Sequence, residues 1–329
     1  MTQPAHLTRR FFLQTTAAGA AATVAGLPAM AATSVNFQLS WLHSVQFGGS
    51  YIAANRGYWA DQGLDVSLTQ GGPNAPVEPP VVSGSALVGI SAADYTAAAV
   101  AQGAPFKIIA VAMQKNPFAI ASLDSNPVNV PADLIGKRIG MAVANTPVLQ
   151  AFCTLNNLDI NQIEIVPTQY DPAPLVSGQV DCLLCWATDL PVAMTVQGVG
   201  NTTMLMGDFG YALHSQTYIA TEETIANRRA DLVALLRGEI KGWTDYLADT
   251  DAVAALTVDM FPDAGLDLET QKLQAKLQVP LMFPSPDGAD SFGRFTEASV
   301  ESNIETLALL GQDVPADLWD ATLIEEAYS

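Results

Sequence analysis

Positive charge is the scarcest property of this 329-residue sequence, in which 14 lysines and arginines stand against 33 aspartates and glutamates. The formal net charge is −19. A protein that binds nucleic acid or an anionic membrane surface needs a basic surface, because it must neutralise phosphate groups. The composition therefore argues against nucleic acid and against anionic lipid as partners.

The sequence also lacks the short motifs of common enzyme classes. It has three histidines and no H-E-x-x-H motif, no G-x-S-x-G nucleophile elbow and neither of the glycine-rich nucleotide-binding loops. His6 lies near the N-terminus, which leaves His43 and His214 for the folded part. Acidic residues are plentiful, but no pattern pairs them. These absences favour a binding protein over an enzyme, and we expect no catalytic residues and no cofactor.

Cysteine is rare, with three residues in the whole chain. Cys182 and Cys185 have the C-x-x-C spacing, but they fall in an apolar run that predicts a buried strand. Residues three apart on a strand point to opposite faces, which disfavours both a disulfide and a shared metal site. No second cysteine pair or histidine cluster completes a zinc site. We therefore expect no metal.

The N-terminal segment has the order of a secretory signal. Arg9-Arg10 precedes a mildly apolar stretch from Thr15 to Leu27, and Ala29-Met30-Ala31 follows. The arginine pair followed by Phe-Leu predicts the twin-arginine export route to the periplasm, with a Sec signal as the alternative. Cleavage after Ala31 would leave 298 residues with a net charge of −21. No later stretch approaches the ~20 apolar residues of a membrane span, so we expect no membrane insertion.

What the sequence does contain is a regular alternation of predicted strands and helices, which is typical of an α/β fold. Its length corresponds to two lobes at roughly 150 residues each. Each lobe is expected to hold a mainly parallel sheet flanked by helices, and the chain beyond Thr221 is expected to be helical. The predicted ranges are a signal over 1–31, a discontinuous first lobe over 32–123 plus 216–329, and a second lobe over 124–215.

Nine strands are predicted, with helices between them. They cover 35–41, 64–68, 86–90, 106–113, 137–141, 163–166, 180–185, 203–206 and 216–220, and residues 118–123 form a further apolar run. The predicted helices cover 46–61, 77–82, 92–102, 146–157 and 190–197, with further helices near 221–224, 232–247, 251–261, 267–277 and 295–310.

Polar and aromatic residues follow the predicted strands of both lobes. In open α/β sheets, ligands bind beyond the carboxyl ends of the strands. Aromatic walls with a few hydrogen-bonding groups suit a small, flat, polar molecule. The candidate ligand-binding residues are Trp41, His43, Gln46, Phe47, Gly72, Asn74, Asp94, Gln114, Lys115, Asn145, Thr146, Tyr170, Trp186 and Asp189.

Each candidate also has a purely structural interpretation. The structural alternative for Trp41 and Trp186 is a place in the core, although a tryptophan at a strand end beside polar neighbours is more often at a surface or cleft. Asp94 is placed for the first turn of a helix, where the helix dipole favours an acidic side chain. Asp189 is placed for a helix N-cap, and Gly71-Gly72-Pro73 for a simple turn.

The motifs at these positions resemble those of the NMT1/THI5-like substrate-binding proteins of ABC importers. The first-lobe motifs are Trp41–Phe47, Asn55–Trp59, Gly63–Val66 and Gly71–Pro73, and the later ones are Gln114–Phe118, Leu134–Lys137 and Val176–Asp181. The resemblance covers about residues 35 to 225. It implies a two-lobed, type II-like clamshell of the periplasmic-binding-protein fold.

The resemblance also implies a function. Such proteins, expected to be monomers, capture a small ligand between their lobes and deliver it to a transmembrane permease with a cytoplasmic ATPase. It favours a thiamine-precursor pyrimidine as the ligand, with riboflavin, a sulfonate or another small organic solute as alternatives. An exported enzyme of pyrimidine or thiamine metabolism is the alternative of another class.

Overall fold

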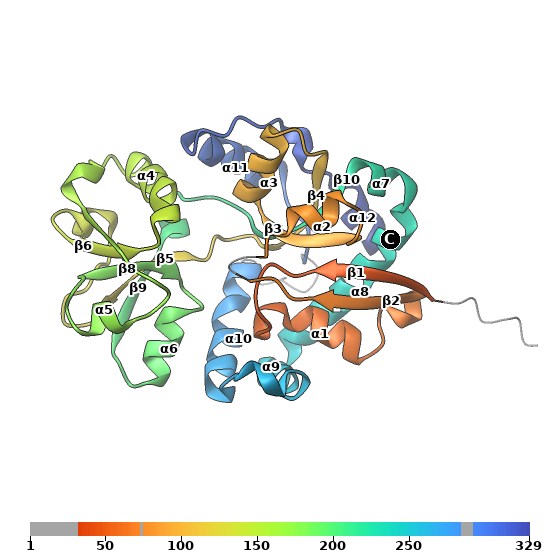
Figure 1. Cartoon of the computed structure of the whole chain (residues 1–329), viewed down its shortest axis with the longest axis horizontal. Coiled ribbons are helices and arrows are strands. Elements are labelled where there is room, and N and C mark those ends of the chain that lie inside the picture. Colours follow the sequence, from red (N-terminus) through yellow and green to blue (C-terminus); the bar gives the residue numbers. More distant parts are fainter. Residues whose placement is uncertain (1–31, 73–74, 284–291) are drawn as a thin grey trace, which may run out of the picture. The chain divides into compact units, whose positions relative to one another are not determined.

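The computed structural model describes residues 32–72, 75–283 and 292–329. The expected signal segment and Asn74 lie outside these residues. The helices and strands of the described chain are drawn in Figure 1. None of the helices in this described part is long and apolar enough to span a bilayer.

The first sheet has five strands in the order β2-β1-β3-β10-β4. β1 pairs in parallel with β2 and with β3, whereas β10 runs antiparallel to β3 and to β4. Four strands therefore share one direction and one is reversed. The strands are β1 (Thr33–Gln38), β2 (Leu64–Thr69), β3 (Val88–Ala92), β4 (Phe106–Met113) and β10 (Ser215–Thr221).

The second sheet repeats this plan in the order β7-β6-β8-β5-β9, with β5 antiparallel to β8 and β9. Its strands are β5 (Phe118–Leu123), β6 (Arg138–Met141), β7 (Glu164–Pro167), β8 (Cys182–Trp186) and β9 (Asn201–Leu205). A strand that arrives directly from the other sheet, without a crossover helix, enters at the carboxyl ends of its neighbours. Such a strand must run antiparallel to them. The two-lobed α/β prediction is confirmed, and each mainly parallel sheet is a mixed one with one reversed strand.

One predicted boundary is wrong. Residues 118–123 were expected in the first lobe, but as β5 they pair with β8 and β9 of the second sheet. The reason is that β5 is apolar and buried like β4, so its composition does not show to which sheet it belongs. The chain crosses between the sheets at residues 114–117, before β5.

Helices flank both sheets. The expected helix over 46–61 is shorter in the structure, because α1 ends at Asn55 and Gly57 follows with a left-handed φ of +72°. The short helix α5 was not predicted, and α12 lies in the stretch expected to be helical but had no predicted bounds. Along the first two-thirds of the chain lie α1 (Gly48–Asn55), α2 (Glu78–Val82), α3 (Ala93–Ala101), α4 (Thr146–Leu155), α5 (Ala173–Val176) and α6 (Leu190–Val196). The remainder holds α7 (Glu222–Asn227), α8 (Arg229–Ala248), α9 (Thr250–Met260), α10 (Leu268–Met282), α11 (Glu297–Leu309) and α12 (Thr322–Tyr328).

The cysteine pair of β8 is divided between the two faces of the second sheet. Cys182 packs in one buried cluster and Cys185 in another. Both thiols, like that of Cys153, are free and buried. Burial raises the pKa of Cys182 to about 12, which keeps its sulfur protonated and unreactive at neutral pH.

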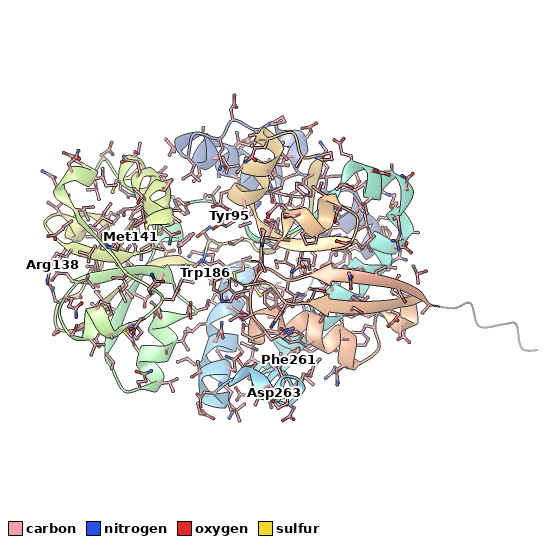
Figure 2. All side chains as sticks on the ribbon, in the orientation of Figure 1. Tyr95, Arg138, Met141, Trp186, Phe261 and Asp263 are labelled. Atoms are coloured by element: carbon pink, nitrogen blue, oxygen red, sulfur yellow. The ribbon has the colours of Figure 1, made fainter. Side chains whose placement is uncertain are left out.

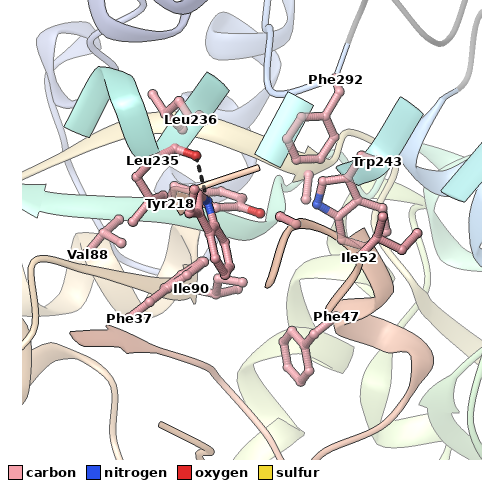
Figure 3. Close-up of a cluster of buried hydrophobic side chains, with 14 of the residues drawn as sticks. Phe37, Phe47, Ile52, Val88, Ile90, Tyr218, Leu235, Leu236, Trp243 and Phe292 are labelled. Carbon is pink, nitrogen blue, oxygen red and sulfur yellow. Dashed lines mark hydrogen bonds between the residues drawn. The ribbon is translucent and has the colours of Figure 1, made fainter. Parts of the chain in front are cut away.

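The main core of the first lobe is built on a close contact between α1 and α8 (Figure 3). Trp243 of α8 stacks on Phe292 with ring centroids 5.5 Å apart. A Cβ atom at Gly49 would lie 2.2 Å from the Trp243 ring, and one at Gly242 would lie 2.1 Å from the Gly49 carbonyl oxygen. The two helices approach this closely only because both positions are glycine.

Gly242→Ala should destabilise the protein. The new methyl group meets backbone rather than a mobile side chain, so the helices must separate, at a cost of about 1–3 kcal/mol. Urea denaturation followed by circular dichroism measures this loss. Thr244→Ala, at an exposed position of the same helix, is the matched control and should change stability by less than about 0.5 kcal/mol. Equal stability of the Gly242→Ala and control proteins would contradict the packing argument.

Glu239 is a fully buried carboxylate beside this contact. Its Oε2 accepts hydrogen bonds from Ser50 Oγ at 3.0 Å, from Trp243 Nε1 at 2.9 Å and from the Tyr218 hydroxyl. Burial raises its pKa from 4.5 to about 7, although these donors favour the charged form. Removal of the carboxylate from water therefore raises the pKa by more than the three hydrogen bonds lower it.

The raised pKa of Glu239 predicts a pH-dependent contribution to stability. Between pH 4.5 and 7 the folded protein holds a proton on Glu239 that the unfolded chain has released, so this contribution falls as pH rises through that range. Glu239→Gln removes the titrating group and is the reference. Between pH 4.5 and pH 7.5 the wild type should lose about 2–3 kcal/mol of unfolding free energy relative to Glu239→Gln. A difference that is constant with pH would show that Glu239 does not titrate there.

Candidate functional site

A cavity of about 630 Å³ lies where strands of both sheets end. This volume is in the range of pockets that enclose a small organic molecule. Tyr95 of the first lobe and Trp186 of the second both line it, and Figure 2 labels both in the region between the two sheets.

The carboxyl ends of the strands position most of the lining. Trp41 and His43 lie in the loop after β1, Gly72 follows β2, and Asp94 lies in the first turn of α3 directly after β3. The second sheet contributes through its own strand ends, because Tyr170 follows β7 and Trp186 is the last residue of β8. Two parallel-strand edges thus supply one cavity, which is the arrangement expected for ligand sites in open sheets.

Aromatic rings come from both sheets. Trp41 and Tyr170 approach each other with ring centroids 6.1 Å apart. Phe118 makes edge contacts with Trp186 at 6.4 Å and with Tyr211 at 6.3 Å. Such rings offer flat apolar faces to a flat ligand and fix its plane.

His43 is held as a neutral group at the cavity wall. Its Nδ1 lies 3.0 Å from the Tyr51 hydroxyl, and its ring stacks on Phe261 at a centroid distance of 3.7 Å. Burial lowers the pKa of His43 below its ordinary value of 6.5. At neutral pH this histidine therefore supplies a hydrogen-bonding ring and no positive charge.

The charge of the lining is of one sign. Among the described residues around the cavity are the carboxylates Glu78, Asp94 and Asp189 and no lysine or arginine. Glu78 accepts a hydrogen bond from Ser91 Oγ. Removal from water raises the pKa of Asp94 and of Asp189. An anionic ligand would find no lysine or arginine among the described lining residues to balance its charge, whereas a neutral ligand needs none.

Nine of the fourteen predicted site residues line the cavity. They are Trp41, His43, Gln46, Gly72, Asp94, Asn145, Tyr170, Trp186 and Asp189.

Four other predicted site residues lie outside the described lining, and Asn74 lies outside the described residues. Phe47 is fully buried in the first-lobe core and packs edge-on against Tyr51. Lys115 forms an ion pair with Asp208. Thr146 donates to the Val143 carbonyl oxygen at 2.7 Å at the start of α4. Gln114 is not part of the lining either.

Several lining residues carried no sequence signal. Gln271 and Gln274 reach the cavity from α10, more than 200 residues along the chain from the Trp41 loop. Gln271 Oε1 accepts a hydrogen bond from the Val45 backbone N–H at 2.7 Å, which ties α10 to that loop. Tyr211 and Gln216 lie on the segment that returns to the first sheet. The pattern predicted a strand over 216–220 and made no prediction for Tyr211. No local pattern could have shown that these side chains meet the cavity.

Two mixed sheets with a shared cavity at their strand ends define the architecture of periplasmic binding proteins. A family model described as NMT1/THI5 like matches residues 44–253. The chain belongs to this family.

Two relatives with named ligands share less than 30% sequence identity with this chain. The riboflavin-binding protein RibY of Chloroflexus aurantiacus is 27% identical over 277 residues, covering 80% of this chain and 78% of that protein. The formylaminopyrimidine-binding protein of Halalkalibacterium halodurans is 21% identical over 264 residues, covering 78% and 79%.

Solved structures share the fold at lower identity. The periplasmic aliphatic sulphonate binding protein SsuA of Escherichia coli superposes with a TM-score of 0.68 at 15% identity, over 85% of this chain and 92% of SsuA. The desulfurization enzyme DSZB superposes with a TM-score of 0.61 at 12% identity, over 90% and 99%. The fold thus occurs both in binding proteins and in an enzyme.

The two histidines of the described chain should both titrate below 6.5. Burial lowers the pKa of His214 to about 4, and burial also lowers the pKa of His43. Histidine ring signals in heteronuclear NMR spectra recorded from pH 3.5 to 8 measure both values, and His43→Gln assigns them. A His43 pKa above 6.5 would mean that this residue is a cation in the cavity, against the charge description above.

Proposed function

We propose that this protein is the extracytoplasmic solute-binding component of an ABC importer. In this role it captures a small nitrogen heterocycle in the cavity and delivers it to a transmembrane permease with a cytoplasmic ATPase. The N-terminal sequence supports export to the periplasm by the twin-arginine route. Family membership supports the transport role.

One observation carries the ligand class, namely aromatic walls from both sheets around a cavity whose described lining holds no basic residue. Aromatic walls favour a flat ring. A sulfonate is permanently anionic and would need cations or oriented N–H groups to replace its water shell. The three lining carboxylates act against such a ligand, so a sulfonate is the least favoured of the alternatives.

A pyrimidine of the thiamine-precursor kind is the favoured ligand, and riboflavin is the second candidate. Both are uncharged heterocycles whose edges carry hydrogen-bond donors and acceptors. The two characterised relatives bind compounds of these two kinds according to their names. Ligand held by Trp41 and Trp186 together would favour the closed state through its contacts with the second lobe.

An enzyme remains the alternative of another class, since DSZB shares the fold. A binding protein releases its ligand unchanged, whereas an enzyme converts it. Mass spectrometry of a bound ligand after prolonged incubation separates the two. A chemically altered ligand would replace the transport role by an enzymatic one.

A thermal-shift panel tests the ligand class, with formylaminopyrimidine, riboflavin and ethanesulfonate as probes. A ligand at about 100 times its Kd stabilises the protein by ~2.7 kcal/mol, so a true ligand gives a clear rise in Tm. We expect a rise with formylaminopyrimidine or riboflavin and none with ethanesulfonate. Trp41→Ala should then weaken calorimetric affinity by about 1–3 kcal/mol, through lost aromatic burial.

Lys115→Ala is the matched control for that series. Lys115 lies outside the lining and pairs with Asp208, so its removal should leave affinity unchanged. Stabilisation by ethanesulfonate alone would overturn the proposed ligand class. Unchanged affinity of Trp41→Ala would remove Trp41 from the site.

A further inference from the structure

The segment that returns from the second sheet to the first concentrates polar atoms without partners. Among the described residues, Tyr211, Gln216 and Thr217 together hold four buried side-chain nitrogen and oxygen atoms that lack a hydrogen-bond partner. Folded proteins pair nearly all such atoms, because an unpaired buried polar group costs stability. A cluster of them beside a cavity therefore points to a partner that is not part of the chain.

The backbone of Gln216 is also strained. Its φ is +48°, in the left-handed region that residues other than glycine rarely adopt. The pairing of β10 with β3 shifts register between Ser215 and Thr217, so Gln216 is the extra residue of a β-bulge. Bulges re-aim a side chain, and strained backbone of this kind is retained mainly at functional sites.

The bulge lies at the cavity. Ser215 and Thr217 pair with Ala92 and Ser91, which themselves line it, and Gln216 is part of the same lining. The Gln216 side chain is only 1% exposed, and neither its Oε1 nor its Nε2 has a hydrogen-bond partner among the described residues. The amide has no bond to give up, so turning it toward a ligand breaks no existing interaction.

We propose that Gln216 is a specificity-determining residue that reads the polar edge of the ligand. A carboxamide presents one acceptor beside donors, which matches a ring nitrogen next to an amino or carbonyl group. Glutamine pairs with the equivalent edge of adenine in the same two-point way. The ligand class is then a heterocycle with a cyclic amidine or lactam edge. This inference rests on the proposed function and names the chemistry that the cavity selects.

Tyr211 supports the same interpretation from the same segment. Its side chain is fully buried, lines the cavity, and its hydroxyl has no partner among the described residues. Burial raises its pKa and the nearby Asp94 raises it further, so the hydroxyl keeps its proton. The return segment thus offers a ligand both an amide and a hydroxyl group.

Gln216→Met separates a ligand-reading role from a structural one. Methionine has a similar length and no amide, so removing the unpaired polar group should raise Tm while weakening the binding of formylaminopyrimidine or riboflavin about tenfold to 100-fold. The matched control is Gln278→Met. Gln278 is equally buried but donates to the Val45 carbonyl oxygen at 3.1 Å and to the Tyr246 hydroxyl at 2.6 Å, and it does not line the cavity. Its loss should lower Tm.

The outcomes distinguish this proposal from the one on which it rests. A lower Tm for Gln216→Met, or unchanged affinity, would overturn the role of Gln216. If that variant does not fold, Gln216→Gly accommodates the positive φ and should show the same loss of affinity. Failure of the wild-type protein to bind either probe would overturn the proposed function instead. Even then, a higher Tm for Gln216→Met and a lower Tm for Gln278→Met would show that the unpaired Gln216 amide destabilises the protein.

Discussion

The pairing of β10 with β3 and β4 is the interaction on which both the fold and the cavity depend. β10 is buried along its whole length and lies between two strands that precede it by more than 100 residues. Without it, β4 would have no partner in the sheet. Its middle carries Tyr218 to the buried Glu239, and its first residues bring the return segment to the cavity. A single strand therefore joins the sheet, the α8 contact and the site.

Sequence reasoning succeeded where a local pattern has one physical meaning. The run Phe106–Met113, apolar except for Lys107, predicted β4 with the observed bounds, because a strand buried on both faces needs mostly apolar residues. It failed where contacts with distant parts of the chain determine the position of an element. The equally apolar β5 gave no sign of its sheet, and α10 reaches the cavity through tertiary packing alone. The rule that ligands bind beyond strand ends placed Trp41, Trp186 and seven other candidates on the lining, yet it gave no access to a residue inside a strand, such as Gln216.

The charge of the cavity, like the position of β5, depends on tertiary structure and could not be predicted from the sequence. The acidic composition argued against nucleic acid but left the ligand's charge open, because Lys115 was a cleft candidate. The structure pairs Lys115 with Asp208 and leaves Glu78, Asp94 and Asp189 as the charged groups of the described lining. The charge of the cavity thus depends on which side chains line it, and the count of acidic and basic residues in the sequence does not reveal this.

Two buried polar groups of the first lobe show how this fold divides stability from recognition. Three donors of the chain bond to Oε2 of Glu239, which links α1, α8 and β10, while its Oε1 has no partner among the described residues. Gln216, two residues before Tyr218, has no such partners and occupies a strained bulge. A scaffold must satisfy its own polar groups, whereas a binding site must leave some unsatisfied until a ligand arrives. The same strand meets both demands, because its middle lies in the core and its start lies at the cavity.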